Sequence, residues 1–255
     1  KNGEKIGKRE CYYEWNNGNK KGVLPKVLDE LLQARKRTRK VQKQYESSNF
    51  MWGVLEGLQL AYKVTCNSVY GQMGASTSAL CIKELAASTT AKGRNLLTIA
   101  KDLVINRELY PKDYLLELNK KIIEDNPKED ASEFINNNNE FKCVYGDTDS
   151  VFIDFDTDNL EEAIRLGLQG GRLVTEELIQ QNRGNHELEY EKTFYPLVLF
   201  TKKRYIGMKY EFNPNKGKLT SMGVVLKRRD NAKILKDIYQ GVIDCIMDNK
   251  EKDYV

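Results

Sequence analysis

The stretch KCVYGDTDSVFIDF, Lys142–Phe155, places two aspartates, Asp147 and Asp149, one residue apart inside a run that otherwise reads as buried strand. Side chains two apart in a strand share a face, and a tight turn between two strands can hold both carboxylates at its tip. Such a pair suits Mg²⁺, which proteins bind through a few carboxylates and substrate phosphates. The alternative is a surface hairpin turn that binds no metal, because Gly and Asp are common in such turns. An EF-hand calcium loop is excluded, because its glycine position falls on Phe152 or Asn159.

Composition places the chain among globular proteins and removes several classes of catalytic chemistry. It has 255 residues, of which 40% are hydrophobic. No run reaches the roughly 18 apolar residues of a membrane span, and the opening KNGEKIGKRE has no apolar signal core, so we expect an intracellular protein with no membrane partner. Five scattered cysteines without a CxxC pair predict reduced thiols, and the single histidine, His186, excludes multi-histidine metal sites. Carboxylates, lysine, arginine and tyrosine remain for any chemistry.

Charge is unevenly distributed along the chain, although the formal net charge is only +4. Basic residues cluster in ARKRTRK, TKKRY and LKRRD, whereas acidic residues dominate 154–162 and 187–191. For binding to a polyanionic partner, such clustering of charge matters more than the net charge of the chain. The sequence therefore favours contact with phosphates.

Hydrophobic periodicity and turn residues predict a mixture of helices and strands. We expect helices at 24–47, 54–70 and 77–106, strands at 10–15, 142–145 and 151–155, a strand-rich section at 188–211 and a closing helix at 232–248. Segment 108–140 is charged and ends in the low-complexity run INNNNEF, so we interpret it as a partly helical insertion and loop. Asp158 and Glu161 form a capping box that starts a helix reaching about residue 181.

A second motif, YKVTCNSVYG, lies on the helix expected at 54–70. Lys63, Asn67 and Tyr70 stand at i, i+4 and i+7 and share one helix face, which carries a cation, an amide and a hydroxylated ring. A triphosphate joined to a sugar and a base suits such a set. A solvated helix face with a tyrosine on its rim is the alternative, and the spacing alone favours it.

Two basic motifs complete the pattern. In ARKRTRKVQK, Arg35 and Arg39 lie one helical turn apart on one face, where their guanidinium groups could donate hydrogen bonds to phosphate oxygens. In TKKRYIG, basic and aromatic residues on a strand suit a nucleic-acid backbone. A solvated basic face and lysines that protect a sheet edge are the corresponding alternatives.

The order of these motifs resembles the family B DNA polymerases, in particular the eukaryotic delta-like and large DNA virus branch. GVLPKVLDELLQARKRTRK is similar to the first fingers helix, KVTCNSVYGQMGA to the Kx3NSxYG motif on the second, VYGDTDSVF to the palm YGDTDS motif and LFTKKRYIG to the KKRY motif. LKRRDN resembles the start of the thumb, and the likeness runs from Gly22 to about Asn231.

The resemblance implies an α+β fold, with an antiparallel palm sheet, flanking helices and two long antiparallel fingers helices. It divides the chain into a palm segment at 1–24, fingers helices at 25–71, palm at 72–225 and the start of the thumb at 226–255. The implied reaction adds deoxynucleotides to a primer 3′ end in DNA replication, in the nucleus or a viral replication compartment. Primer-template DNA and an incoming dNTP are the implied partners, with a processivity factor as a further one and Mg²⁺ as the cofactor.

The resemblance also implies residue roles. Asp149 is expected to bind Mg²⁺ directly, with Asp147 supporting the site and binding metal only at some stages. The residues expected to hold the nucleotide, Lys63 also serving in catalysis, are Arg35, Arg39, Lys63, Asn67 and Tyr70. Those expected to contact the primer duplex are Lys202, Lys203, Arg204 and Tyr205.

Departures from the family pattern and rival interpretations shape the expectation. The DxxSLYPS segment that carries the family's other metal aspartate, the exonuclease motifs and most of the thumb are absent, so we expect a fragment with little or no synthesis alone. A reverse transcriptase or a nucleotide cyclase is a rival palm enzyme, against which Asn67 and Ser68 argue. A non-catalytic basic nucleic-acid-binding module is the rival from another class.

Overall fold

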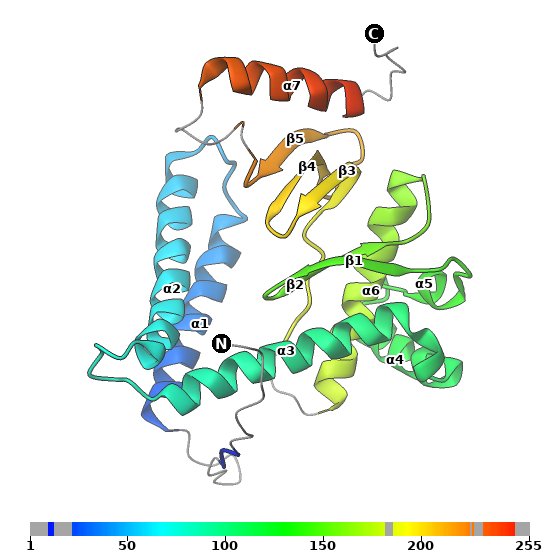
Figure 1. The fold of residues 1–255 in the computed structure, drawn as a ribbon. Helices are drawn as coiled ribbons and strands as arrows, with labels where there is room; N and C mark the ends of the chain where they lie inside the picture. The colour runs from blue at the N-terminus through cyan, green and yellow to red at the C-terminus, as the bar shows by residue number, and fades with distance from the viewer. Residues whose placement is uncertain (1–9, 13–21, 182–185, 225, 227–231, 248–255) are drawn as a thin grey trace. The chain divides into compact units, whose positions relative to one another are not determined.

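The computed structural model describes residues 10–12, 22–181, 186–224, 226 and 232–247, which form helices and antiparallel sheets (Figure 1). This mixture confirms the α+β class. The chain divides into two compact units, Lys1–Lys92 and Gly93–Val255. That division falls inside a helix, and the domain boundaries expected from the sequence stay predictions.

The first unit is built on two antiparallel helices, α1 (Val23–Gln42) and α2 (Phe50–Gly74). Their direction follows from two side-chain contacts, in which Arg35 meets Gln59 and Gln42 meets Glu56. α1 ends earlier than the expected residue 47, because a turn follows Gln42. α2 begins before residue 54 because the Asn49 side chain caps it, accepting a hydrogen bond from the Met51 N–H.

A third long helix, α3 (Lys83–Ile105), begins later than the expected residue 77. Residues 75–82 instead form a turn, in which the Ser78 hydroxyl accepts from the Leu80 N–H. The Ile82 N–H then donates to the Met73 carbonyl at 2.9 Å and ties this turn back to the end of α2. The polar residues between Ala75 and Ile82 therefore form the connection from α2 to α3 and do not extend α3 toward its N-terminus.

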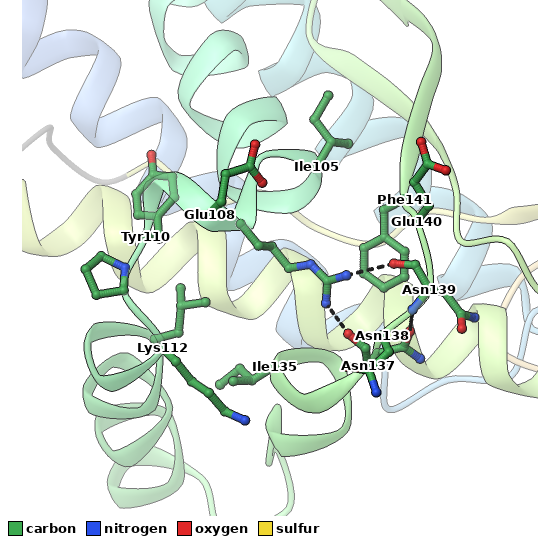
Figure 2. A pocket seen from close by; sticks show the side chains of 13 residues that line it. Ile105, Glu108, Tyr110, Lys112, Ile135, Asn137, Asn138, Asn139, Glu140 and Phe141 are labelled. Carbon is green, nitrogen blue, oxygen red and sulfur yellow. Dashed lines mark hydrogen bonds between the residues drawn. The ribbon is translucent and has the colours of Figure 1, made fainter.

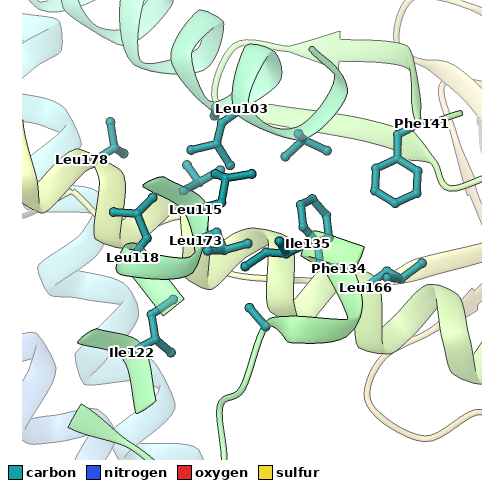
Figure 3. Packing of buried hydrophobic residues seen from close by; sticks show 14 residues of the cluster. Leu103, Leu115, Leu118, Ile122, Phe134, Ile135, Phe141, Leu166, Leu173 and Leu178 are labelled. Carbon is teal, nitrogen blue, oxygen red and sulfur yellow. The ribbon is translucent and has the colours of Figure 1, made fainter. Parts of the chain in front are cut away.

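The core of the second unit lies where the C-terminal part of α3 packs with α4 (Lys112–Asp125), α5 (Ser132–Asn136) and α6 (Leu160–Gln180), as Figure 3 shows. Its largest fully buried side chains include Leu103, Leu118, Phe134 and Leu173. Segment 108–140 was expected to be a partly helical insertion and loop. It does contain helices, α4 and α5, but the expectation did not include their place in the core. The periodic leucines and isoleucines of α4 make the segment part of the core.

The low-complexity asparagine run is fixed by Arg107, which follows α3 in the short helix η1 (Arg107–Leu109). Its guanidinium donates to the carbonyls of Phe134, Asn137 and Asn139 at 2.7 to 3.1 Å and lies 4.1 Å from the centre of the Phe141 ring. Arg107 also lines a pocket of about 610 Å³. Asn137, Asn139 and Phe141 line the same pocket, as Figure 2 shows. A charged donor thus gives this polar run a defined backbone path.

The cap of α6 differs from the sequence prediction. Asn159, and not Asp158, accepts hydrogen bonds from the N–H groups of Glu161 and Glu162. Aspartate and asparagine are both good N-cap residues. The predicted N-cap lies one residue before the observed one, because sequence patterns locate helix ends only to within one or two residues. The side chain of Glu162 accepts a hydrogen bond from the Thr157 hydroxyl at 2.5 Å.

All described strands are antiparallel, but they form two sheets where one palm sheet was expected. The first pairs β1 (Lys142–Asp147) with β2 (Ser150–Asp154). The second has the order β3 (Thr193–Thr201), β4 (Arg204–Tyr210), β5 (Lys218–Met222). The closing helix α7 runs over Lys233–Met247, close to its expected span. Most of the strand expected at 10–15 lies outside the described residues, and Glu10–Tyr12 show no strand.

No helix in the described part of the chain is long and apolar enough to cross a bilayer. The five cysteines, Cys11, Cys66, Cys81, Cys143 and Cys245, carry free thiols.

We predict that Phe134→Ala loosens the core of the second unit. Removing a fully buried ring leaves a cavity and costs about 3–5 kcal/mol. Hydrogen exchange on the complete gene product should show faster amide exchange in α4 and α6. Phe50→Ala is the matched control, because Phe50 is 81% exposed and its loss should leave exchange unchanged. Equal exchange in the two variants would contradict the assigned core.

Candidate functional site

The two predicted metal-binding aspartates lie at the tip of the β1–β2 hairpin. Asp147 ends β1 and pairs with Ser150, which begins β2, so Thr148 and Asp149 form the turn. The Asp149 N–H donates to the Asp147 carbonyl, and Thr148 has a φ of 52°. A β-branched residue rarely adopts a positive φ, so the turn is held in a strained conformation. The structure thus confirms the tight turn between two strands that the sequence predicted.

Asp147 is held by a cation from another turn. Lys203 Nζ lies 2.7 Å from Oδ1 and 2.6 Å from Oδ2 of Asp147, and the Thr148 hydroxyl donates to Oδ1 at 3.1 Å. The hydrogen bond from Lys203 is the main reason why the pKa of Asp147 is lowered. The same contact raises the pKa of Lys203. Asp147 is therefore kept ionised with its charge compensated.

Asp149 has a different environment, although it stands two residues away. Its side chain is exposed and forms no hydrogen bond or ion pair with another described residue. Within the described ranges, no three side chains of the His, Cys, Asp and Glu types gather closely enough to form a metal cage. An open carboxylate beside a second one fits Mg²⁺ of the kind that takes its remaining ligands from substrate phosphates and water.

The turn that supplies Lys203 joins β3 to β4. Thr201 pairs with Arg204, which leaves Lys202 and Lys203 at the turn, and Lys203 has a φ of 60°. Gly223, which follows β5, lies against this turn, because a Cβ at that position would lie 2.2 Å from the Lys203 carbonyl oxygen. The φ of Gly223 is 63°. Any side chain at residue 223 would displace the turn.

Tyr145 is a site residue that sequence reasoning missed. Its hydroxyl accepts a hydrogen bond from the Lys203 backbone N–H at 2.9 Å. A signal was present, since Tyr145 stands two residues before Asp147 on β1 and therefore shares its face. The two turns are thus joined by one side-chain pair and one backbone donor.

Aromatic rings pack the two sheets together behind the turns. Phe152 lies 5.2 Å from Tyr145, 6.0 Å from Phe194 and 5.5 Å from Tyr205, measured between ring centres. Tyr205 is only 9% exposed, and burial raises the pKa of its hydroxyl. Its ring is a packing element here, and its expected contact with primer DNA stays a prediction. Lys202 and Arg204 are exposed at the turn.

The predicted nucleotide-binding residues belong to the first unit. Lys63, Asn67 and Tyr70 all lie on α2, so their helical spacing is confirmed, and all three are exposed. On α1, Arg39 is exposed, whereas Arg35 is half-buried and its Nε donates to Gln59 Oε1 at 3.2 Å. The convergence of these residues with the aspartates stays a prediction.

Comparisons with known proteins agree on one family. The model of DNA polymerase family B matches residues 5–254. The DNA polymerase of Pyramimonas orientalis virus is 36% identical over 298 residues, covering 96% of this chain and 22% of the viral protein. The DNA polymerase delta catalytic subunit of Plasmodium falciparum is 35% identical over 233 residues, covering 91% of this chain and 19% of that protein. The chain thus spans about a fifth of the length of these curated relatives.

A solved structure is similar in fold. The family B DNA polymerase from the hyperthermophilic archaeon Pyrobaculum calidifontis gives a TM-score of 0.50 at 22% sequence identity. The match covers 93% of this chain and 24% of the archaeal one. At this identity the likeness supports the fold alone.

We predict that Lys203→Gln raises the pKa of Asp147 toward its ordinary range, because the charged donor is lost. In the unaltered chain the pairing is present above the ordinary aspartate range and is lost as pH falls through the lowered pKa. Carbodiimide labelling over a pH series, read by mass spectrometry, reports the protonated fraction of Asp147. Lys202→Gln is the control and should leave the labelling profile unchanged. A Lys203→Gln profile identical to that control would show that the ion pair is absent in solution.

Proposed function

The chain belongs to DNA polymerase family B, and we propose that it supplies fingers and palm elements to a DNA-directed DNA polymerase. The proposed reaction adds deoxynucleotides to the 3′ end of a primer, with primer-template DNA and dNTP as substrates. The observation that carries the proposal is the β1–β2 hairpin, which presents one open carboxylate, Asp149, beside one charge-compensated carboxylate, Asp147.

The hairpin is suited to Mg²⁺ chemistry on phosphates. In the proposed site Asp149 would hold Mg²⁺ directly, and Asp147, which Lys203 now compensates, would support the site and bind metal only at some stages. The bound metal would neutralise triphosphate charge and lower the pKa of the primer hydroxyl. The protein's own share is to keep Asp147 ionised and to present Asp149 at the tip of a strained turn, which the Lys203 contact to Asp147 and the conformation of Thr148 support.

The cationic residues of the first unit are proposed to hold the triphosphate. Arg35 and Arg39 offer planar forks that match phosphate oxygens, and Lys63 offers a mobile point charge. Asn67 orients the nucleotide, and Tyr70 lies under the new base pair. Two observations support these roles. Lys63, Asn67 and Tyr70 share one face of α2, and all five side chains except that of Arg35 are exposed. Such residues neutralise charge that develops in phosphoryl transfer.

The β3–β4 turn is proposed to contact the primer duplex. Lys202 and Arg204 are exposed and can reach backbone phosphates. Lys203 and Tyr205 already hold the turn against the hairpin, so they would place the primer end relative to the carboxylates. A processivity factor is a further proposed partner, and the nucleus or a viral replication compartment is the proposed place of action.

A non-catalytic nucleic-acid-binding module is the second candidate, and the exposed lysines and arginines favour it. This candidate predicts DNA binding that weakens steeply with salt and is indifferent to the aspartates.

We predict that Asp149→Asn abolishes Mg²⁺-dependent primer extension by the complete gene product, because the open metal-binding carboxylate is lost. Affinity for primer-template DNA, measured by anisotropy, should stay within about twofold, since base and phosphate contacts are untouched. Asp156→Asn is the matched control, an exposed aspartate just beyond the same hairpin, and should extend normally. Normal extension by Asp149→Asn would favour the binding module.

A separate prediction concerns Lys63. Lys63→Ala should slow single-nucleotide incorporation about a hundredfold, as the loss of a preorganised charge does. Lys120→Ala, an exposed lysine on α4, is the control and should retain the full rate. Rapid-quench measurements at saturating dNTP separate this rate effect from weaker binding. An undiminished rate in Lys63→Ala would remove Lys63 from the proposed site.

A further inference from the structure

A chain of polar side chains connects α1 to α2 beneath Arg35. The Glu56 carboxylate accepts from Gln42 Nε2 at 2.7 Å and from Gln59 Nε2 at 2.9 Å. The Gln59 Oε1 atom then accepts from Arg35 Nε at 3.2 Å. Gln42 and Gln59 are each only 8% exposed, so these contacts lie in the interface between the two helices. Water competes weakly with hydrogen bonds buried in this way.

The sequence of donors and acceptors fixes the direction of the Gln59 amide. A carboxylate only accepts, so Glu56 must face the NH₂ side of Gln59. The amide oxygen is therefore turned toward Arg35. Gln42 occupies the other oxygen of Glu56 and prevents the carboxylate from turning away. Glu56, which is not itself hydrogen-bonded to Arg35, thus decides the orientation of the acceptor for Arg35.

The contact uses only one of the five donors of the guanidinium. Arg35 bonds through Nε, and its terminal nitrogens form no hydrogen bond with another described residue. Because the guanidinium is planar, a hydrogen bond from Nε restricts the orientations that the whole group can take. The terminal nitrogens are left as a fork of the kind that binds phosphate oxygens.

The polar chain continues along the face of α2 that carries the proposed nucleotide-binding residues. Glu56, Gln59, Lys63, Asn67 and Tyr70 recur at spacings of three and four, so they share one side of the helix. At the end of the stripe that meets α1, Gln59 is buried, Glu56 is half-buried and both are hydrogen-bonded. Lys63, Asn67 and Tyr70 are exposed. The buried part is placed to orient a cation beside the exposed part.

We propose that Gln59 and Glu56 are positioning residues that orient the Arg35 guanidinium for the triphosphate of the incoming nucleotide. This inference rests on the proposed function, because it requires Arg35 to bind the nucleotide. Neither residue touches the substrate, and both act through Arg35. The competing interpretation is that the polar chain only holds α1 against α2, and that interpretation predicts different kinetics.

The first experiment changes Gln59 to leucine in the complete gene product. Leucine keeps the helix propensity and the buried volume but offers no acceptor to Arg35. We expect the KM for dNTP to rise about tenfold through misplacement of a binding group, with kcat changed much less. Affinity for primer-template DNA should be unchanged. Gln33→Leu is the matched control, because Gln33 is exposed on α1, and its KM should be unaltered.

The second experiment repeats Gln59→Leu in an Arg35→Ala background. If Gln59 acts through Arg35, the second substitution adds no further rise in KM, because the group that it positions is gone. Amide exchange in α1 and α2 is measured in parallel to show that the helix pair stays folded. If the two effects multiply, or exchange rises throughout both helices, the polar chain is only a packing element and the inference fails.

The single variants separate the two proposals. If Arg35→Ala raises the KM for dNTP and Gln59→Leu does not, the positioning role is wrong while the proposed function stands. If Arg35→Ala itself leaves the KM unchanged, Arg35 does not bind the nucleotide, and both the residue assignment and the inference are overturned. Glu56→Ala provides a further check and should raise the KM by a smaller factor than Gln59→Leu, since the amide remains but is free to turn.

Discussion

The ion pair between Lys203 and Asp147 joins two turns that are far apart in the sequence. Each turn contains a residue with positive φ, Thr148 in one and Lys203 in the other. An exposed ion pair contributes little stability by itself. Here it acts together with the Tyr145 hydroxyl and the ring cluster around Phe152, so several contacts share the task of holding the turns. Asp147 and Lys203 are placed by this combination.

One consequence is that two neighbouring aspartates have different chemistry. Asp147 is compensated by Lys203, and its pKa is lowered for that reason. Asp149 points into solvent and is open to a cation. A spacing of two residues therefore gives one carboxylate that stabilises the local structure and one that is available to bind. The proposed division between supporting and direct metal binding follows from this difference.

The same use of polar contacts recurs away from the hairpin. Arg107 directs three carbonyls of the asparagine-rich segment, and Glu56 directs the amide that meets Arg35. Arg107 has its partners on a different segment, whereas Glu56 has one partner, Gln42, on α1 and one, Gln59, on its own helix. Buried polar groups that are fully paired specify one arrangement of the elements around them. Hydrophobic packing alone would fix these side chains less uniquely.

The sequence by itself determined the helices of α1 and α2, the β1–β2 turn and the family, because these depend on local periodicity, on turn residues and on motif spacing. It placed Lys63, Asn67 and Tyr70 correctly on one helix face. Only the tertiary structure decided that segment 108–140 belongs to the core, that the strands form two sheets, and that Lys203 pairs with Asp147. The physical reason is range: a hydrogen bond between residues 56 positions apart leaves no periodic trace in the chain. Such contacts exist only once the hydrophobic core has brought the elements together.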